Sequence, residues 1–122
     1  MQSKYLYAHL SVLAANLIYG ANYTIAKEVM PEFIGDIYGY LNKSVRYPRQ
    51  AINAGVQGRV IIQFVVNEDG HISRAAVMHG IGGGCDEEAL RVVNAMPAWK
   101  PGKQNGQPVK VNYRLPISFK LE

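Results

Sequence analysis

The sequence predicts an α+β domain, a three-stranded antiparallel sheet with helices packed on one face, preceded by one hydrophobic helix. Two stretches, residues 59–66 and 109–121, alternate apolar and polar side chains, which is typical of strands with one buried face. An Asp-Gly turn at residues 69–70 follows the first stretch, and residues 86–96 carry apolar side chains at helical spacing. From residue 47 onward we expect the order helix, strand, strand, helix, strand.

The hydrophobic helix is expected within residues 1–30. Residues 5–26 contain no charged side chain, and Lys4 and Lys27 close the segment at its two ends. A helix of this length would extend about 33 Å, enough for a hydrocarbon core of about 30 Å. We therefore predict a membrane anchor. A cleaved signal peptide and a soluble or interfacial helix are the alternatives.

This first segment also resembles part of a known transporter family. Residues 19–23, residues 25–27 and Pro31 are similar to the end of the first membrane helix of drug/metabolite (EamA-like) transporters, and the resemblance covers residues 5–31. Members of that family carry many membrane helices. This chain has one hydrophobic segment, so no transport pathway can be built from it alone.

Residues 31–46 are predicted to bridge the anchor and the main domain. Ile34, Ile37, Tyr38 and Leu41 have the spacing of one face of a short helix. The main domain is then expected to occupy residues 47–122. It begins with a two-turn helix that follows Pro48 and ends at a Gly55 C-cap.

The predicted hairpin follows that short helix. In the first strand, residues 59–66, four apolar side chains share the inner face, and residues 67–70 form the turn. The second strand, residues 71–79, alternates less cleanly, which indicates a bulge near residues 74–76. The inner-face residues are Val60, Ile62, Phe64 and Val66.

The remaining elements are one helix and the final strand. Asp86 is expected to cap a helix over residues 86–96, and Trp99, the only tryptophan, is expected to be buried beneath this helix. Residues 103–108 are expected to be a polar loop.

The final strand is predicted to lie at a sheet edge. Proline cannot donate to a ladder, and Pro116 lies well inside residues 109–121. Such an edge either is guarded by charge or accepts another strand, and Lys110, Arg114 and Lys120 lie on the solvent face.

The sequence offers no catalytic constellation. The net charge of +4 is scattered along the chain, which favours a solvated basic surface over a nucleic-acid site. The single cysteine, Cys85, excludes an internal disulfide. Residues 82–84 are all glycine, but carboxylates follow them where a phosphate would bind. His71 and His79, with Asp69 or Asp86, match no common metal spacing. We expect no enzymatic activity, no cofactor and no metal.

From residue 47 onward the chain resembles the C-terminal domain of TonB-family energy transducers, and residues 31–46 resemble the segment that leads into it in some members. Residues shared with that pattern run through the whole domain: Tyr47, Pro48, Ala51, Gly55, residues 58–60, residues 64–66, Asp69, Gly70, Val77, residues 86–90, Met96, Pro97, residues 99–102, Gly106, Pro108, Val109, Pro116 and Ile117.

The resemblance implies a single-pass inner-membrane protein of Gram-negative bacteria with this domain in the periplasm. Its implied partners are an outer-membrane TonB-dependent transporter and inner-membrane motor proteins of the ExbB/ExbD type, with no nucleic acid. A homodimer is left open. Its implied role is to bind an extended transporter segment and to pass on force derived from the proton gradient.

We predict that the partner segment pairs with the backbone of the last strand while two residues at the start of the domain flank it. The alternative is a membrane-helix component of a transporter assembly, with the C-terminal domain as an accessory interaction module. The predicted partner-binding residues are Val109, Lys110, Val111, Asn112, Tyr113, Arg114, Leu115, Tyr47 and Pro48.

Overall fold

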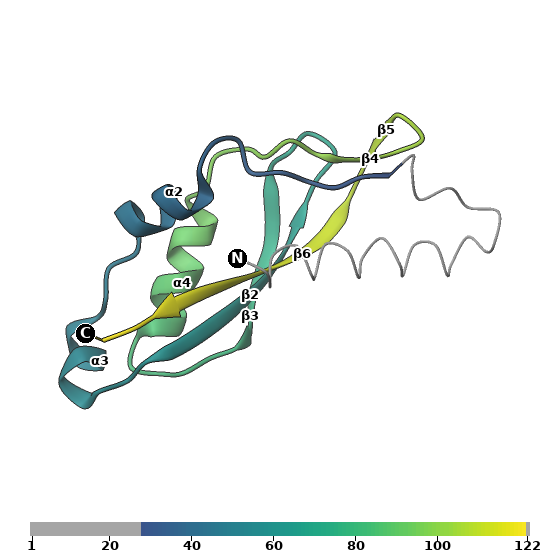
Figure 1. Cartoon of the computed structure of the whole chain (residues 1–122). Helices are drawn as coiled ribbons and strands as arrows, with labels where there is room; N and C mark the ends of the chain where they lie inside the picture. Colours follow the sequence, from purple (N-terminus) through teal and green to yellow (C-terminus); the bar gives the residue numbers. More distant parts are fainter. Residues whose placement is uncertain (1–27, 122) are drawn as a thin grey trace.

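The computed structural model describes residues 28–121, which form two antiparallel three-stranded sheets together with short helices (Figure 1). In chain order the elements are β1 (Glu28–Val29), α2 (Ile37–Ser44), α3 (Arg49–Ala54), β2 (Gly58–Val66), β3 (Ile72–His79), α4 (Cys85–Asn94), β4 (Gly102–Gln104), β5 (Gln107–Val109) and β6 (Val111–Phe119).

The main sheet has the order β3-β2-β6, with β2 in the centre and antiparallel to both neighbours. β2 and β6 pair without interruption from Gly58 opposite Phe119 to Val66 opposite Val111. The predicted three-stranded antiparallel sheet and the order of its elements are confirmed.

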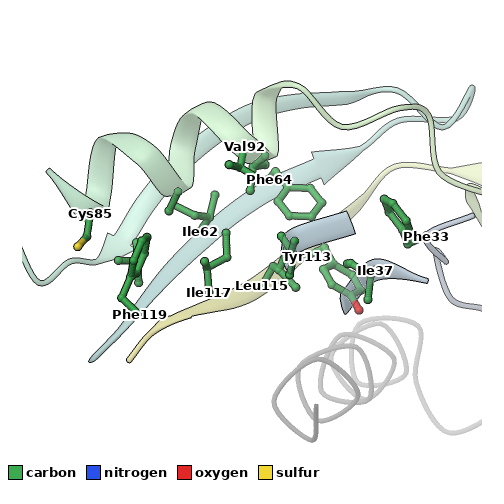
Figure 2. Close-up of a cluster of buried hydrophobic side chains, with 14 of the residues drawn as sticks. Phe33, Ile37, Ile62, Phe64, Cys85, Val92, Tyr113, Leu115, Ile117 and Phe119 are labelled. Atoms are coloured by element: carbon green, nitrogen blue, oxygen red, sulfur yellow. The ribbon is translucent and has the colours of Figure 1, made fainter. Parts of the chain in front are cut away.

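One face of this sheet carries the core. The inward side chains of β2 are fully buried, as are Ala89, Val92 and Val93 of α4. Figure 2 shows the inward side chains of β2 and β6 gathered between the strands and α4. The apolar side chains at every second strand position and those on one face of α4 therefore pack together in a single layer. The inward residues of β2 and β6 are Val60, Ile62, Phe64, Val66, Tyr113, Leu115, Ile117 and Phe119.

Trp99 closes one end of this core, as predicted. Its side chain is 1% exposed and makes edge contacts with Phe33, Phe64 and Tyr113, at ring-centre distances of 4.9 to 5.7 Å. Gly70 of the hairpin turn accepts the Trp99 backbone N–H at 2.8 Å, and a Cβ at Gly70 would overlap the Trp99 carbonyl oxygen. The turn glycine is thus required both for its φ of 88° and for this close approach.

β3 pairs with β2 less regularly than β6 does. The pairing shifts at two places, between Ile61 and Ile62 and between Gln63 and Val65. At the second shift Arg74 has a φ of 55°, in the left-handed region. The predicted bulge near residues 74–76 is confirmed.

The smaller sheet, of order β1-β4-β5, was not predicted. Residues 103–108, expected to be a loop, instead form the hairpin of β4 and β5, and positive φ values at Asn105 and Gly106 turn it. Val109 belongs to β5, opposite Gly102, and Lys110 separates β5 from β6. The prediction of one unbroken strand over residues 109–121 was therefore wrong, because the chain passes from one sheet to the other at Lys110.

Two predicted helix starts also differ from the structure. α2 begins at Ile37 because Asp36 caps it, accepting from the Tyr38 N–H at 3.1 Å, and Ile34 lies outside it, 57% exposed. α4 begins at Cys85 with Gly84 as N-cap. Asp86 does not cap α4; its Oδ1 accepts from the backbone N–H of Ile81 and of Gly82, in the loop before the helix.

Residues 28–46 pack against the main domain and contribute side chains to its core. Phe33, Ile37 and Leu41 are all less than 9% exposed and belong to the same core cluster. Between residues 28 and 121, none of the helices is both long and apolar enough to cross a membrane. The predicted anchor, residues 5–26, lies outside the described residues.

Candidate functional site

The outer edge of β6 is the strongest candidate site. Within residues 28–121, β6 pairs with β2 on one side, and no strand pairs with its other side. Alternate backbone N–H and C=O groups of an edge strand point away from its one neighbour, which is the geometry that strand addition uses.

The predicted partner-binding residues are divided between two elements. Val111 to Leu115 lie on β6, whereas Val109 lies on β5 and Lys110 between the two strands. Tyr113 and Leu115 are at most 2% exposed, so their side chains hold β6 in the core and leave only its backbone for a partner. The exposed or half-buried side chains of Asn112 and Arg114 face outward, and Arg114 donates to Gln63 Oε1 on β2 at 3.0 Å.

Tyr47 and Pro48 lie at the opposite end of β6 from Val111. The Tyr47 ring packs edge-on against Phe119 at 5.4 Å, and its hydroxyl donates to the Val56 carbonyl. Burial, and to a smaller extent the Cys85 thiol, raises the pKa of Tyr47. Pro48 precedes α3 and lies against Gly84. The structure therefore places Tyr47 beside the C-terminal end of β6 and Pro48 against the loop before α4, and neither of them next to residues 111–115.

A groove of about 380 Å³ follows that half of the edge. Five consecutive residues, Pro116 to Lys120, line it, together with residues of α2 and of the connector after α2. The described residues that line the groove are Tyr38, Leu41, Asn42, Val45, Tyr47, Arg59, Pro116, Ile117, Ser118, Phe119 and Lys120.

Sequence reasoning missed most of this groove. The helical spacing of Tyr38 and Leu41 could have indicated an apolar wall, but nothing in the pattern showed that this wall faces the β6 edge. The contribution of Arg59 depends on the register that puts it opposite Ser118, which only the structure gives.

Polar contacts to α4 hold the wall of the groove in place. The Tyr40 hydroxyl donates to the Val92 carbonyl at 3.0 Å, and Arg91 donates to the Ser44 carbonyl at 2.9 Å. Glu88 Oε2 accepts the Arg46 N–H at 2.7 Å and also pairs with Arg91 at 2.7 Å. The Arg91 side chain, followed by the Arg46 backbone, holds the pKa of Glu88 below its usual value against the opposing effect of burial.

Three other residues considered from the sequence, His71, Cys85 and Asp86, lie in different surroundings. His71 Nδ1 lies 3.1 Å from Asp69 Oδ2, and both side chains are exposed to solvent. The hydrogen bond from the His71 backbone N–H lowers the pKa of Asp69. Burial raises the pKa of the Cys85 thiol, which opposes its use as a nucleophile. The Asp86 carboxylate already occupies the N–H of Gly82. No group of three metal-ligating side chains comes together among the described residues.

Comparison with known proteins agrees with the overall fold described above. Residues 43–121 match the family model described as "Gram-negative bacterial TonB protein C-terminal". The solution structure of the Helicobacter pylori TonB C-terminal domain, residues 179–285, aligns with a TM-score of 0.55 at 19% identity, over 89% of this chain and 94% of that one. A shorter form of the same domain, residues 194–285, gives a TM-score of 0.53 at 23% identity, over 70% and 90% of the two chains. Among curated proteins, none matches this chain.

Proposed function

Because this chain belongs to the family of Gram-negative bacterial TonB protein C-terminal domains, we propose that it is a non-enzymatic binding module that docks an extended segment of an outer-membrane transporter. The segment would add to β6 as a fourth strand of the main sheet, by main-chain hydrogen bonds. The observation that carries the proposal is the regular β6 strand, paired with β2 over its whole length and, within residues 28–121, paired with no strand on its other side.

The family supports a periplasmic location for the domain. We propose that residues 5–26 anchor the chain in the inner membrane as a single helix. Motor proteins of the ExbB/ExbD type would then act on that helix, and the domain would pass force from the proton gradient to the docked transporter segment.

A peptide in which valine alternates with threonine tests docking on the full-length chain in detergent micelles. The alternation suits any strand edge, and the peptide carries no charge. On binding, every second backbone amide of β6 should exchange its hydrogen more slowly, as measured by NMR, because those amides gain a partner. A scrambled peptide with clustered valines serves as the control for adsorption to micelles.

Asn112→Pro gives the second arm of this test. If the Asn112 N–H faces the edge, the variant should keep its fold and lose peptide binding, because proline has no amide proton. If it instead unfolds, the amides on either side of Asn112 face the edge, and the exchange data should show protection there. A folded variant that binds the peptide at full strength, with no β6 amide protected in the wild type, would contradict docking at this edge.

A further inference from the structure

A second cavity, of about 260 Å³, lies on the outer face of the main sheet and shares no described residue with the groove beside β6. Val65 of β2 lies opposite Ser73 of β3 and opposite Asn112 of β6, so these three residues form one row across the sheet. Because Val65 alternates with buried residues, the row lies on the face away from the core. The described residues that line the cavity are Val65, Asn67, Ser73, Arg74, Lys110, Val111 and Asn112.

Two cations line this cavity without a counter-charge. Arg74 lies on β3 and Lys110 between β5 and β6, and both are exposed. Within residues 28–121, neither side chain forms a hydrogen bond or an ion pair. The carboxylates of the adjoining turn, Glu68 and Asp69, do not line the cavity. The cavity is therefore positively charged.

A hydroxyl donor lies beside the two cations. Ser73 and Arg74 are consecutive, and in a regular strand they would lie on opposite faces. The register shift and the φ of 55° at Arg74 break this alternation, and both residues line the cavity. Ser73 Oγ accepts from Asn67 Nδ2 at 2.9 Å, which leaves the hydroxyl proton of Ser73 available to donate.

We propose that this cavity binds a phosphate group, with Arg74 and Lys110 as its counter-charges and the Ser73 hydroxyl as a further donor. Guanidinium and ammonium groups both form charge-assisted hydrogen bonds with phosphate oxygens. Donors on β3 and at the junction of β5 and β6 suit a tetrahedral group better than a planar carboxylate. The volume lies below the roughly 300–1,000 Å³ of pockets for drug-sized ligands, which favours a small anionic group.

The phosphate has two conceivable sources, a lipid headgroup and the free ion. A Cβ at Gly102 would lie 3.1 Å from the Val29 carbonyl oxygen and 2.8 Å from Val111 Cγ2, and Val111 lines the cavity. One wall of the cavity therefore lies close to the start of the described chain, at the end of the molecule that holds β1, β4 and β5 (Figure 1). If residues 5–26 are the membrane anchor proposed above, this end lies next to the headgroups of that membrane.

Titration of inorganic phosphate into the full-length chain, in micelles of an uncharged detergent, tests the site. Backbone amide shifts are followed by NMR at constant ionic strength, with chloride and acetate as reference anions. We expect phosphate to shift the amides of Ser73, Arg74 and Lys110, and acetate and chloride to leave them in place. An equal response to acetate would overturn the choice of phosphate.

Variants at the two cations show whether the cavity itself binds. Arg74→Gln and Lys110→Gln should each weaken phosphate binding about twofold to fivefold, as expected for exposed ion pairs. Arg49→Gln and Lys43→Gln remove the same charges from α3 and α2, at exposed positions that do not line the cavity, and should bind as the wild type does. Equal weakening in all four variants would mean that net charge alone acts, and this would overturn the inference.

Bilayer nanodiscs of phosphatidylcholine, with and without phosphatidylglycerol, distinguish the two sources. Shifts of the same amides on adding phosphatidylglycerol identify a lipid headgroup, whereas shifts with inorganic phosphate alone identify the free ion. Either result supports the site, and no shift in both experiments overturns it. The anchor is tested separately, by whether the chain co-elutes with the nanodiscs, and docking at β6 by the peptide experiment above, so failure of either is distinguishable from failure of this inference.

Discussion

At the scale of single residues, Trp99 joins most parts of the fold. Its ring contacts Phe33 from the N-terminal segment, Phe64 from β2 and Tyr113 from β6, and its backbone N–H bonds the hairpin turn at Gly70. A large side chain that is 1% exposed cannot be shortened without leaving a cavity.

Trp99→Ala should therefore reduce the free energy of unfolding by about 3–5 kcal/mol. Urea denaturation followed by circular dichroism measures this without needing tryptophan fluorescence. Ile34→Ala, at a position that is 57% exposed, is the matched control and should change stability by less than about 0.5 kcal/mol. A loss below about 1 kcal/mol for Trp99→Ala would be incompatible with the burial described here.

For single residues, the sequence pattern predicts burial better than it predicts hydrogen-bond partners. The burial of Trp99 was expected from its size and aromatic character. The inward faces of β2 and β6 followed from apolar spacing, because burial and period are directly linked. The role of Asp86 did not. An aspartate before an apolar stripe suits an N-cap, and only the loop geometry shows that its carboxylate bonds the N–H groups of Ile81 and Gly82 instead.

At the scale of elements, Glu88 joins α4 to the connector that follows α2. The folded-state pKa of Glu88 lies below its unfolded value, so the carboxylate form stabilises the fold. This contribution is fully present above the unfolded pKa and is lost as pH falls through the folded pKa. The effect therefore belongs to the acid range, below about pH 4.5.

Glu88→Gln should be less stable than the wild type at pH 7, and the difference should diminish as pH falls below about 4.5. Urea midpoints measured between pH 7 and pH 3 test this. Asp69→Asn is the comparison, because the pKa of Asp69 is also lowered while its pair with His71 is exposed and spans only the turn. If the stability difference between Glu88→Gln and the wild type stays constant down to pH 3, the variant is destabilised by altered packing and not by the loss of the negative charge.

Elements also show where periodicity misleads. The alternation of residues 109–121 continues smoothly through Lys110, although the chain leaves one sheet and enters another there. The smaller sheet does have a sequence signal, Asn105-Gly106, a pair typical of hairpin turns. The groove had none, because it depends on how α2 lies against β6.

At the scale of the whole molecule, the predicted fold class and family are confirmed for the domain, while the anchor stays a prediction. The predicted division of the chain at residue 47 also stays a prediction, although Phe33, Ile37 and Leu41 join the core from before that point. Their spacing suggested a helix, and no local pattern could show which surface that helix covers.

A reporter fused after Glu122 tests the proposed topology. The family favours the periplasm, whereas Lys27, Lys43 and Arg46 after the apolar segment would favour the cytoplasm. We expect alkaline phosphatase at this position to be active, and a cytoplasm-specific reporter to be inactive. The opposite result would exclude a periplasmic domain.

The contrast between the two edges of the main sheet has a consequence for assembly. β6 is regular and can template a neighbour, whereas the two register shifts and the left-handed Arg74 make β3 a poor template. The main sheet can therefore be extended in one direction only, from β6. Each domain therefore offers a guest strand a single edge of its own, and two domains joined edge to edge through β6 would present only irregular β3 strands at the outer ends of their shared sheet.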